Sequence, residues 1–153
     1  MKRTLSGAIT VLGLSLVCIA LSGCGGPEGV GKVSGTVTLE GKPLAFAIVR
    51  FAPKNGGAPS KAITDESGRY SLQYTRSYAG AVVGEHIVSI STYAAAIPDA
   101  DPAKPEVPEK VPAKYNAKSE LVVTVKSGSN TLDFPLDLKG AIAQTAKDRS
   151  QWR

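Results

Sequence analysis

Apolar and polar residues alternate along most of the chain after residue 31, a pattern typical of β-strands that bury one face. In KVSGTVTL (32–39), Val33, Val37 and Leu39 lie on one face and mostly polar residues lie on the other. The alternation recurs in AFAIVRF (45–51), KAIT (61–64), YSLQY (70–74), GEHIVSIST (84–92), ELVVTVK (120–126) and TLDFPLDL (131–138). The pattern therefore predicts seven short strands and almost no helix between residues 30 and 138.

Turn residues separate these segments and indicate how they connect. Gly41 and Pro43 mark a turn in EGKPL, and Asp65 with Gly68 marks a hairpin in DESG. Pro135 interrupts the last segment, which predicts an edge strand or a bulge there. We therefore predict an all-β fold, a seven-stranded antiparallel Greek-key sandwich.

The first 24 residues, MKRTLSGAITVLGLSLVCIALSGC, have a different character. Lys2 and Arg3 are followed by an uncharged stretch from Thr4 to Gly26. A positive start followed by a short apolar stretch is typical of an export signal. A retained membrane helix over residues 4–23 is the alternative, because about 20 apolar residues can span a bilayer.

The segment Leu21-Ser22-Gly23-Cys24 resembles the lipobox of bacterial lipoproteins. The resemblance implies cleavage between Gly23 and Cys24 and lipid attachment to the Cys24 thiol. Two or three acyl chains hold a protein on a membrane durably. Gly25 stands where an aspartate would signal inner-membrane retention, which favours an outer membrane or cell-surface location.

These features divide the chain into four parts. We predict a signal peptide at 1–23, a flexible Gly-rich tether at 24–31, a β-sandwich at 32–138 and a tail at 139–153. The tail has weak helical spacing at Ile142, Ala146 and Arg149 and ends near Trp152. A frayed end is expected there, and contact with a membrane or cell-wall polymer is the alternative.

Charge and cysteine content exclude several classes of function. The net charge of +5 falls to +3 without Lys2 and Arg3, and the basic residues are scattered, so we expect no nucleic-acid partner. Cys18 and Cys24 both lie before the sandwich and cannot crosslink it. We expect no metal and no cofactor, because the only histidine, His86, has no neighbouring ligand in the sequence.

Three segments, VSGTVTLEGKPLAFAIVRFAP, ITDESGRYSL and GEHIVSIS, together resemble a carboxypeptidase regulatory-like domain. The resemblance implies a transthyretin-like, immunoglobulin-like sandwich with an aromatic residue where this chain has His86. The later segment VPAKYNAKSELVVTVKSGSNTLDFPL is similar to the second half of small bacterial lipoproteins built on that domain. This similarity implies that Pro112, Lys114 and Tyr115 dock onto the body.

Candidate reactive residues are few, and each has a structural alternative. His86 is either a general base or, as we expect, a core residue. Asp65 and Glu66 are either calcium ligands or part of a plain turn, and DESG lacks the alternating ligands of a calcium loop. Asp99 and Asp101 are a weaker case of the same kind. We predict no catalytic residues and a chain that is not an enzyme.

The segment 93–114 holds five of the ten prolines, at 98, 102, 105, 108 and 112. Loops this long are uncommon in compact domains and are often functional or disordered. A stiff crossover between the two sheets is expected, and a recognition strip laid along the sandwich is the alternative.

Together these features predict a non-catalytic cell-envelope lipoprotein with a structural or protein-interaction role. Its expected partners are the membrane, through the lipid on Cys24, and an envelope protein or polysaccharide. The alternative is a binding module for a polysaccharide, peptide or small ligand through the sandwich loops. A binding module should show a concave pocket or exposed aromatics, such as Tyr74, Tyr78 and Tyr93, whereas an assembly protein should show an open strand edge.

Overall fold

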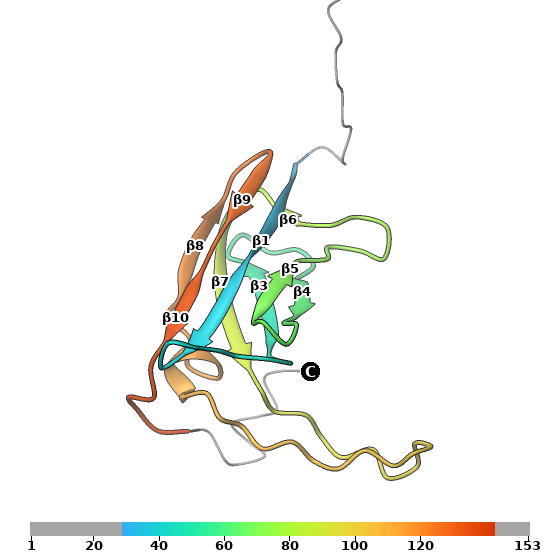
Figure 1. Ribbon diagram of the computed structural model, residues 1–153. Coiled ribbons are helices and arrows are strands. Elements are labelled where there is room, and N and C mark those ends of the chain that lie inside the picture. The colour runs from blue at the N-terminus through green and yellow to red at the C-terminus, as the bar shows by residue number, and fades with distance from the viewer. Residues whose placement is uncertain (1–28, 143–153) are drawn as a thin grey trace, which may run out of the picture.

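The computed structural model describes residues 29–142 and shows two β-sheets packed face to face (Figure 1). One 3-10 turn, η1 (Ala113–Tyr115), accompanies the strands. The strands are β1 (Val30–Leu39), β2 (Lys42–Pro43), β3 (Ile48–Pro53), β4 (Ser60–Ile63), β5 (Arg69–Ser71), β6 (Ala81–Val82), β7 (Gly84–Ser91), β8 (Val122–Val125), β9 (Ser129–Thr131) and β10 (Phe134–Leu136).

The first sheet is organised around β1, the longest strand. The carbonyl of Val33 accepts the N–H of Leu72, and the carbonyl of Ser34 accepts the N–H of Leu132. Because successive residues of a strand direct their main-chain groups to opposite edges, the two carbonyls define two edges. Strands β2, β5 and β6 pair antiparallel along one edge, and β9 and β10 pair parallel along the other.

The second sheet has the order β4-β3-β7-β8 and is antiparallel throughout. Its register places Phe51 opposite Val88 and His86 opposite Val123. Alternate residues therefore point into the sandwich, and the residues between them point outward.

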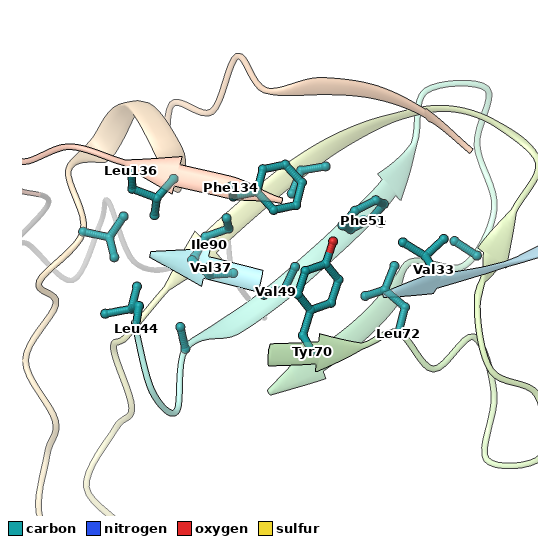
Figure 2. Close-up of a cluster of buried hydrophobic side chains, with 14 of the residues drawn as sticks. Val33, Val37, Leu44, Val49, Phe51, Tyr70, Leu72, Ile90, Phe134 and Leu136 are labelled. Atoms are coloured by element: carbon teal, nitrogen blue, oxygen red, sulfur yellow. The ribbon is translucent and has the colours of Figure 1, made fainter. Parts of the chain in front are cut away.

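The core lies between the sheets and is built from apolar side chains of both (Figure 2). Its aromatic centre is a group of rings in which Phe51 contacts Tyr70, His86 and Phe134 at centroid distances of 5.8 to 6.4 Å. Aromatic pairs at such distances add to the stabilisation that burial provides. Tyr70 also donates a hydrogen bond of 2.7 Å from its hydroxyl to the carbonyl of Leu132, which joins β5 to the segment between β9 and β10.

The predicted all-β sandwich is confirmed, and each predicted strand is present. The last predicted segment is divided at Asp133, whose carboxylate accepts the N–H of Thr36 at 2.7 Å in place of a main-chain carbonyl. Pro135 lies in β10, at the edge of its sheet, as its sequence position predicts. Strand β1 begins at Val30, inside the segment predicted as a tether.

The predicted turn after β4 is also present. The Asp65 carboxylate accepts the N–H groups of Ser67 and Arg69 at 2.8 and 2.9 Å, and Gly68 has a φ of +74°. A Cβ at Gly68 would meet the carbonyl oxygen of Val37 at 2.5 Å, so both conformation and space require glycine there.

The Pro-rich segment forms an arm, defined here as residues 93–108, that extends away from the sandwich (Figure 1). Ala94 pairs with Val107 and Ile97 pairs with Lys104 through main-chain hydrogen bonds. The arm connects β7 to β8, which are neighbours in the second sheet. The expectation of a crossover between the sheets is therefore wrong, and the arm does not lie along the sandwich.

Several predicted features fall on residues that the structure does not describe. The predicted cleavage site at Gly23 and Cys24 lies outside the described residues, as do Ala146, Arg149 and Trp152 of the tail. Within residues 29–142, no helix has the length and apolar character needed to cross a membrane.

Candidate functional site

The outer face of the second sheet carries a row of side chains whose positions follow from the strand register. Ile48 lies opposite Ile63, and Arg50 lies opposite Lys61. All four point away from the core, because the intervening Val49 is completely buried. A sheet face exposed to solvent thus combines branched apolar side chains with two cations.

Two hollows lie on this face and share Arg50. The first has a volume of about 340 Å³, and Ile48, Ile63, Lys61 and Tyr93 are among the residues that line it. The second has a volume of about 260 Å³ and includes Ile87, Ser89, Asn116 and Ser119 in its lining. We call the two hollows together the outer groove. The first hollow alone is at the lower end of the range of volumes for ligand pockets.

The positive charge in the outer groove is not neutralised by neighbouring residues. The ion pairs between residues 29 and 142 are Lys54–Glu85, Arg69–Asp65 and Lys114–Asp137. Arg50 and Lys61 therefore have no carboxylate within 4 Å in this part of the chain. Two cations beside apolar side chains make the groove suited to an anionic group attached to an apolar body.

One wall of the groove is fixed by a buried carboxylate, that of Glu109, which is 7% exposed. It accepts hydrogen bonds from the Ser91 hydroxyl at 2.5 Å, the Thr92 N–H at 2.9 Å and the Val111 N–H at 2.9 Å. These bonds tie the end of β7 to the segment that returns from the arm. Tyr93, the residue after Thr92, is thereby held at the mouth of the first hollow.

The sequence gives no signal for the role of Glu109. The residue lies in a polar, Pro-rich segment where exposure is the usual outcome, and no pattern distinguishes it from Glu106. Only the fold brings the end of β7 and the returning chain together around one carboxylate.

The segment after Glu109 covers part of the outer face and forms the second hollow. Asn116 donates a 2.9 Å hydrogen bond from its side-chain amide to the carbonyl of Val111, and the hydroxyl of Ser119 donates to the carbonyl of Val88. These bonds account for the burial of Ser89 on a face that is otherwise exposed.

The predicted docking of Pro112, Lys114 and Tyr115 is confirmed. Pro112 is buried, Tyr115 packs against the core, and Lys114 lies 2.6 Å from the carboxylate of Asp137. The hydrogen bond from Lys114 lowers the pKa of Asp137, and the same bond raises the pKa of Lys114. The ammonium of Lys114 also lies 4.7 Å from the centre of the Tyr115 ring.

His86 is a core residue, 1% exposed, as expected. Its Nε2 lies 2.7 Å from the carbonyl oxygen of Val82, and because a carbonyl only accepts, Nε2 carries the proton. Nδ1 has no hydrogen-bond partner among the described residues. The ring packs against Phe51 at 5.8 Å, so it takes an aromatic residue's place and is out of reach of a substrate in solvent.

The acidic candidates are not brought together. Asp65 uses its carboxylate for its own turn and for an exposed ion pair with Arg69 at 3.1 Å. The hydrogen bond from the Arg69 N–H is the main cause of the lowered pKa of Asp65. Asp99 and Asp101 lie near the end of the arm. Between residues 29 and 142, no three histidine, cysteine, aspartate or glutamate side chains form a group that could hold a metal ion.

The three candidate tyrosines are in different surroundings. Tyr93 lines the outer groove. Tyr74 and Tyr78 belong to the loop after β5, which is closed by a 2.9 Å hydrogen bond from the Tyr74 N–H to the Tyr78 carbonyl. Only Tyr93 of the three contributes to the concave site.

Comparison with known proteins shows no family for this chain. No family model matches the chain, and no curated protein matches it. A solved structure similar to it is a 9R-lipoxygenase from Cyanothece PCC8801, with 17% identity and a TM-score of 0.41. The match covers 72% of this chain and 16% of the lipoxygenase chain, so this chain spans a small part of that protein.

This neighbour corrects one expectation. The prediction that the chain is not an enzyme is contradicted, since one of the solved structures similar to it is that of a lipoxygenase. The likeness is also too distant to carry an argument for lipoxygenase activity. No statement about catalysis in this chain follows from the comparison.

Proposed function

We propose that this chain is an exported, lipid-anchored protein of the cell envelope whose β-sandwich binds a ligand in the outer groove. Export and anchoring rest on the leader and on the lipobox resemblance at Leu21–Cys24. Cys24 is the proposed lipid attachment site, with cleavage between Gly23 and Cys24. An outer membrane or cell-surface location is favoured by Gly25.

We also propose that the body is a carboxypeptidase regulatory-like domain. Three turn residues on which the resemblance rests support the proposal: Gly41 and Gly68 both have positive φ, and Pro43 pairs with Thr38 in the first hairpin. His86 packs as an aromatic ring would at its position.

The observation that carries the binding proposal is the placement of Arg50 and Lys61, with no carboxylate partner in residues 29–142, beside Ile48 and Ile63 in a hollow of about 340 Å³. Arg50 is half-buried and Lys61 is exposed, so an anion bound in the hollow could reach both cations and form charge-assisted hydrogen bonds with them. The ligand class is an anion with an apolar neighbour, such as an acidic peptide. A concave site of this kind supports the binding-module alternative over a purely structural role.

A titration followed by NMR tests this proposal. The ¹⁵N-labelled chain lacking residues 1–24 is titrated with acetylated pentapeptides centred on Leu-Asp-Leu, and with matched peptides centred on Leu-Asn-Leu and Leu-Lys-Leu. We expect amide shifts to concentrate at β3 and β4, around Arg50 and Lys61, and to be largest for the aspartate peptide. Lys42→Ala, in the other sheet, is the control variant and should leave the shifts unchanged. Equal responses to all three peptides would contradict the proposal.

Anchoring is tested separately by mass spectrometry of the mature protein from a bacterial membrane fraction. We expect lipid on Cys24 and a Cys24→Ser variant that is no longer processed. An intact N-terminus at Met1 would contradict the lipoprotein assignment.

A further inference from the structure

Strand β8 (Val122–Val125) is the last strand of the second sheet, and within residues 29–142 it pairs only with β7. The N–H of Val88 donates to the carbonyl of Leu121 at 2.8 Å. This bond shows which residues of β8 direct their main-chain groups toward β7. Leu121, Val123 and Val125 therefore direct their main-chain groups toward β7. The main-chain groups of Val122 and Thr124 point away from the sheet and have no partner in residues 29–142.

The open stretch is short and has a defined end. The side-chain amide of Asn130 donates to the carbonyl of Lys126 at 2.8 Å and accepts its N–H at 2.9 Å, as a neighbouring strand would. Asn130 thus closes the edge at Lys126 and leaves Val122 and Thr124 open. Natural sheets usually protect edges with charges, prolines or bulges inside the strand, and β8 has none of these.

The sequence of this edge is complementary to itself. An antiparallel partner centred on Val123 places Val122 opposite Thr124 of the second copy, so the open main-chain groups pair with each other. The same register brings the side chain of Glu120 near the side chain of Lys126 of the second copy, just beyond the point where Asn130 ends the main-chain pairing, at both ends of the paired segment. Both side chains are exposed, and neither forms an ion pair in the described part of the chain.

We propose that β8 pairs with β8 of a second copy of this chain about a two-fold axis at Val123, which joins two four-stranded sheets into one continuous sheet. Val122, which is 49% exposed on the outer face, becomes partly covered by the second copy. Charge complementarity selects the second copy over a strand of unrelated sequence. The axis is perpendicular to the sheet, so both outer grooves open on the same face of the dimer.

The edge proposed to pair lies apart from the outer groove, and different observations support the two proposals. The first hollow is lined by residues of β3 and β4, by the end of β7 and by Tyr93, and no residue of β8 is among those that line either hollow. A failure of ligand binding would leave the pairing intact, and a monomeric chain would leave the groove intact.

Sedimentation of the full chain in detergent tests the pairing, with co-purification of two differently tagged copies as a second readout. We expect a dimer, and about ten-fold weaker association for Glu120→Lys or Lys126→Glu, each of which places like charges together at both ends. The double variant Glu120→Lys/Lys126→Glu exchanges the charges and should recover wild-type association. Recovery by the double exchange is specific to self-pairing.

A main-chain variant gives an independent test. Thr124→Pro removes an N–H that faces the open edge and none that bonds to β7, so it should abolish association while the circular dichroism spectrum is retained. Thr124→Val keeps the N–H and serves as the control. A wild-type chain that stays monomeric at about 0.5 mM overturns the proposal, as does a dimer that none of these variants weakens. In another outcome, the wild-type chain retains a different protein and no second copy of itself, while Thr124→Pro retains neither. That result would assign the edge to the other protein and overturn the proposal of self-pairing.

Discussion

The carboxylate of Glu109 accepts the main-chain N–H of Thr92 at 2.9 Å, and it does so in a buried position where the chain leaves the sheet for the arm and returns from it. The same carboxylate accepts the N–H of Val111 at 2.9 Å. One side chain thus joins the two ends of a sixteen-residue arm, residues 93–108, directly before Tyr93. Tyr93, which follows this closure in the chain, forms part of the wall of the outer groove.

Replacing Glu109 with alanine should lower the free energy of unfolding by about 3 kcal/mol, because several buried donors lose a charged acceptor at once. Urea unfolding measures the loss. Glu66→Ala, an exposed glutamate in the turn after β4, is the control and should change the stability by less than about 0.5 kcal/mol. Equal effects of the two substitutions would show that the Glu109 network does not stabilise the fold.

Gly35→Ala should prevent stable folding. A Cβ at Gly35 would lie 1.9 Å from the carbonyl oxygen of Leu132 and 3.1 Å from the Tyr70 ring, and the first of these is main chain that cannot move without separating β1 from its neighbour. Gly56→Ala is the matched control: its φ of +84° predicts a cost of about 1 to 2 kcal/mol, with nothing within 4 Å to clash. A melting temperature for Gly35→Ala equal to that of Gly56→Ala would contradict the packing around Leu132.

Tyr70→Phe tests the hydrogen bond from the Tyr70 hydroxyl to the carbonyl of Leu132, the same carbonyl that faces Gly35. The ring and its burial are kept, and the 2.7 Å bond to the Leu132 carbonyl is lost, so we expect about 1 kcal/mol lower stability in urea. Burial raises the pKa of the Tyr70 hydroxyl, and the charge of Asp133 adds to this effect. The hydroxyl should therefore stay protonated when exposed tyrosines ionise. An ultraviolet titration in which all five tyrosines ionise together would contradict this placement.

The ion pair of Lys114 and Asp137 should make stability depend on pH at the acid end. Because the folded state lowers the pKa of Asp137, its contribution is complete above the ordinary aspartate pKa and is lost as the pH falls through the lowered value. The raised pKa of Lys114 has the opposite sign, so that contribution is lost only as the pH rises through the raised value. Asp137→Asn should make the melting temperature depend less on pH in the acid range. Profiles of equal slope in variant and wild type would show that the pair has no such effect.

Local patterns in the sequence were sufficient to predict most of the second sheet. The alternation in GEHIVSIST puts His86, Val88 and Ile90 on one face of a strand, and the structure buries all three. Antiparallel neighbours joined by turns need only short-range information, and glycine, proline and aspartate mark those turns directly.

The remaining features depend on contacts between distant parts of the chain. Parallel pairing of β1 with β9 and β10 joins residues almost 100 positions apart, and no local pattern encodes the choice of parallel partner. The burial of Glu109 and the placement of Arg50 beside Tyr93 also depend on contacts between segments that are distant in the sequence. The sequence could therefore predict Tyr93 as an exposed aromatic, but not the groove in which it lies.

The affinity of the chain for an aspartate-centred peptide, compared between wild type and Arg50→Gln, tests the central claim most directly. Arg50 lies in both hollows of the outer groove, and the substitution removes its charge while retaining a side chain that can form hydrogen bonds. We predict about ten-fold weaker binding of the aspartate peptide to Arg50→Gln, with no change for the asparagine peptide and no change in melting temperature. Identical affinities of wild type and Arg50→Gln for the aspartate peptide would contradict the assignment of the outer groove as an anion-binding site.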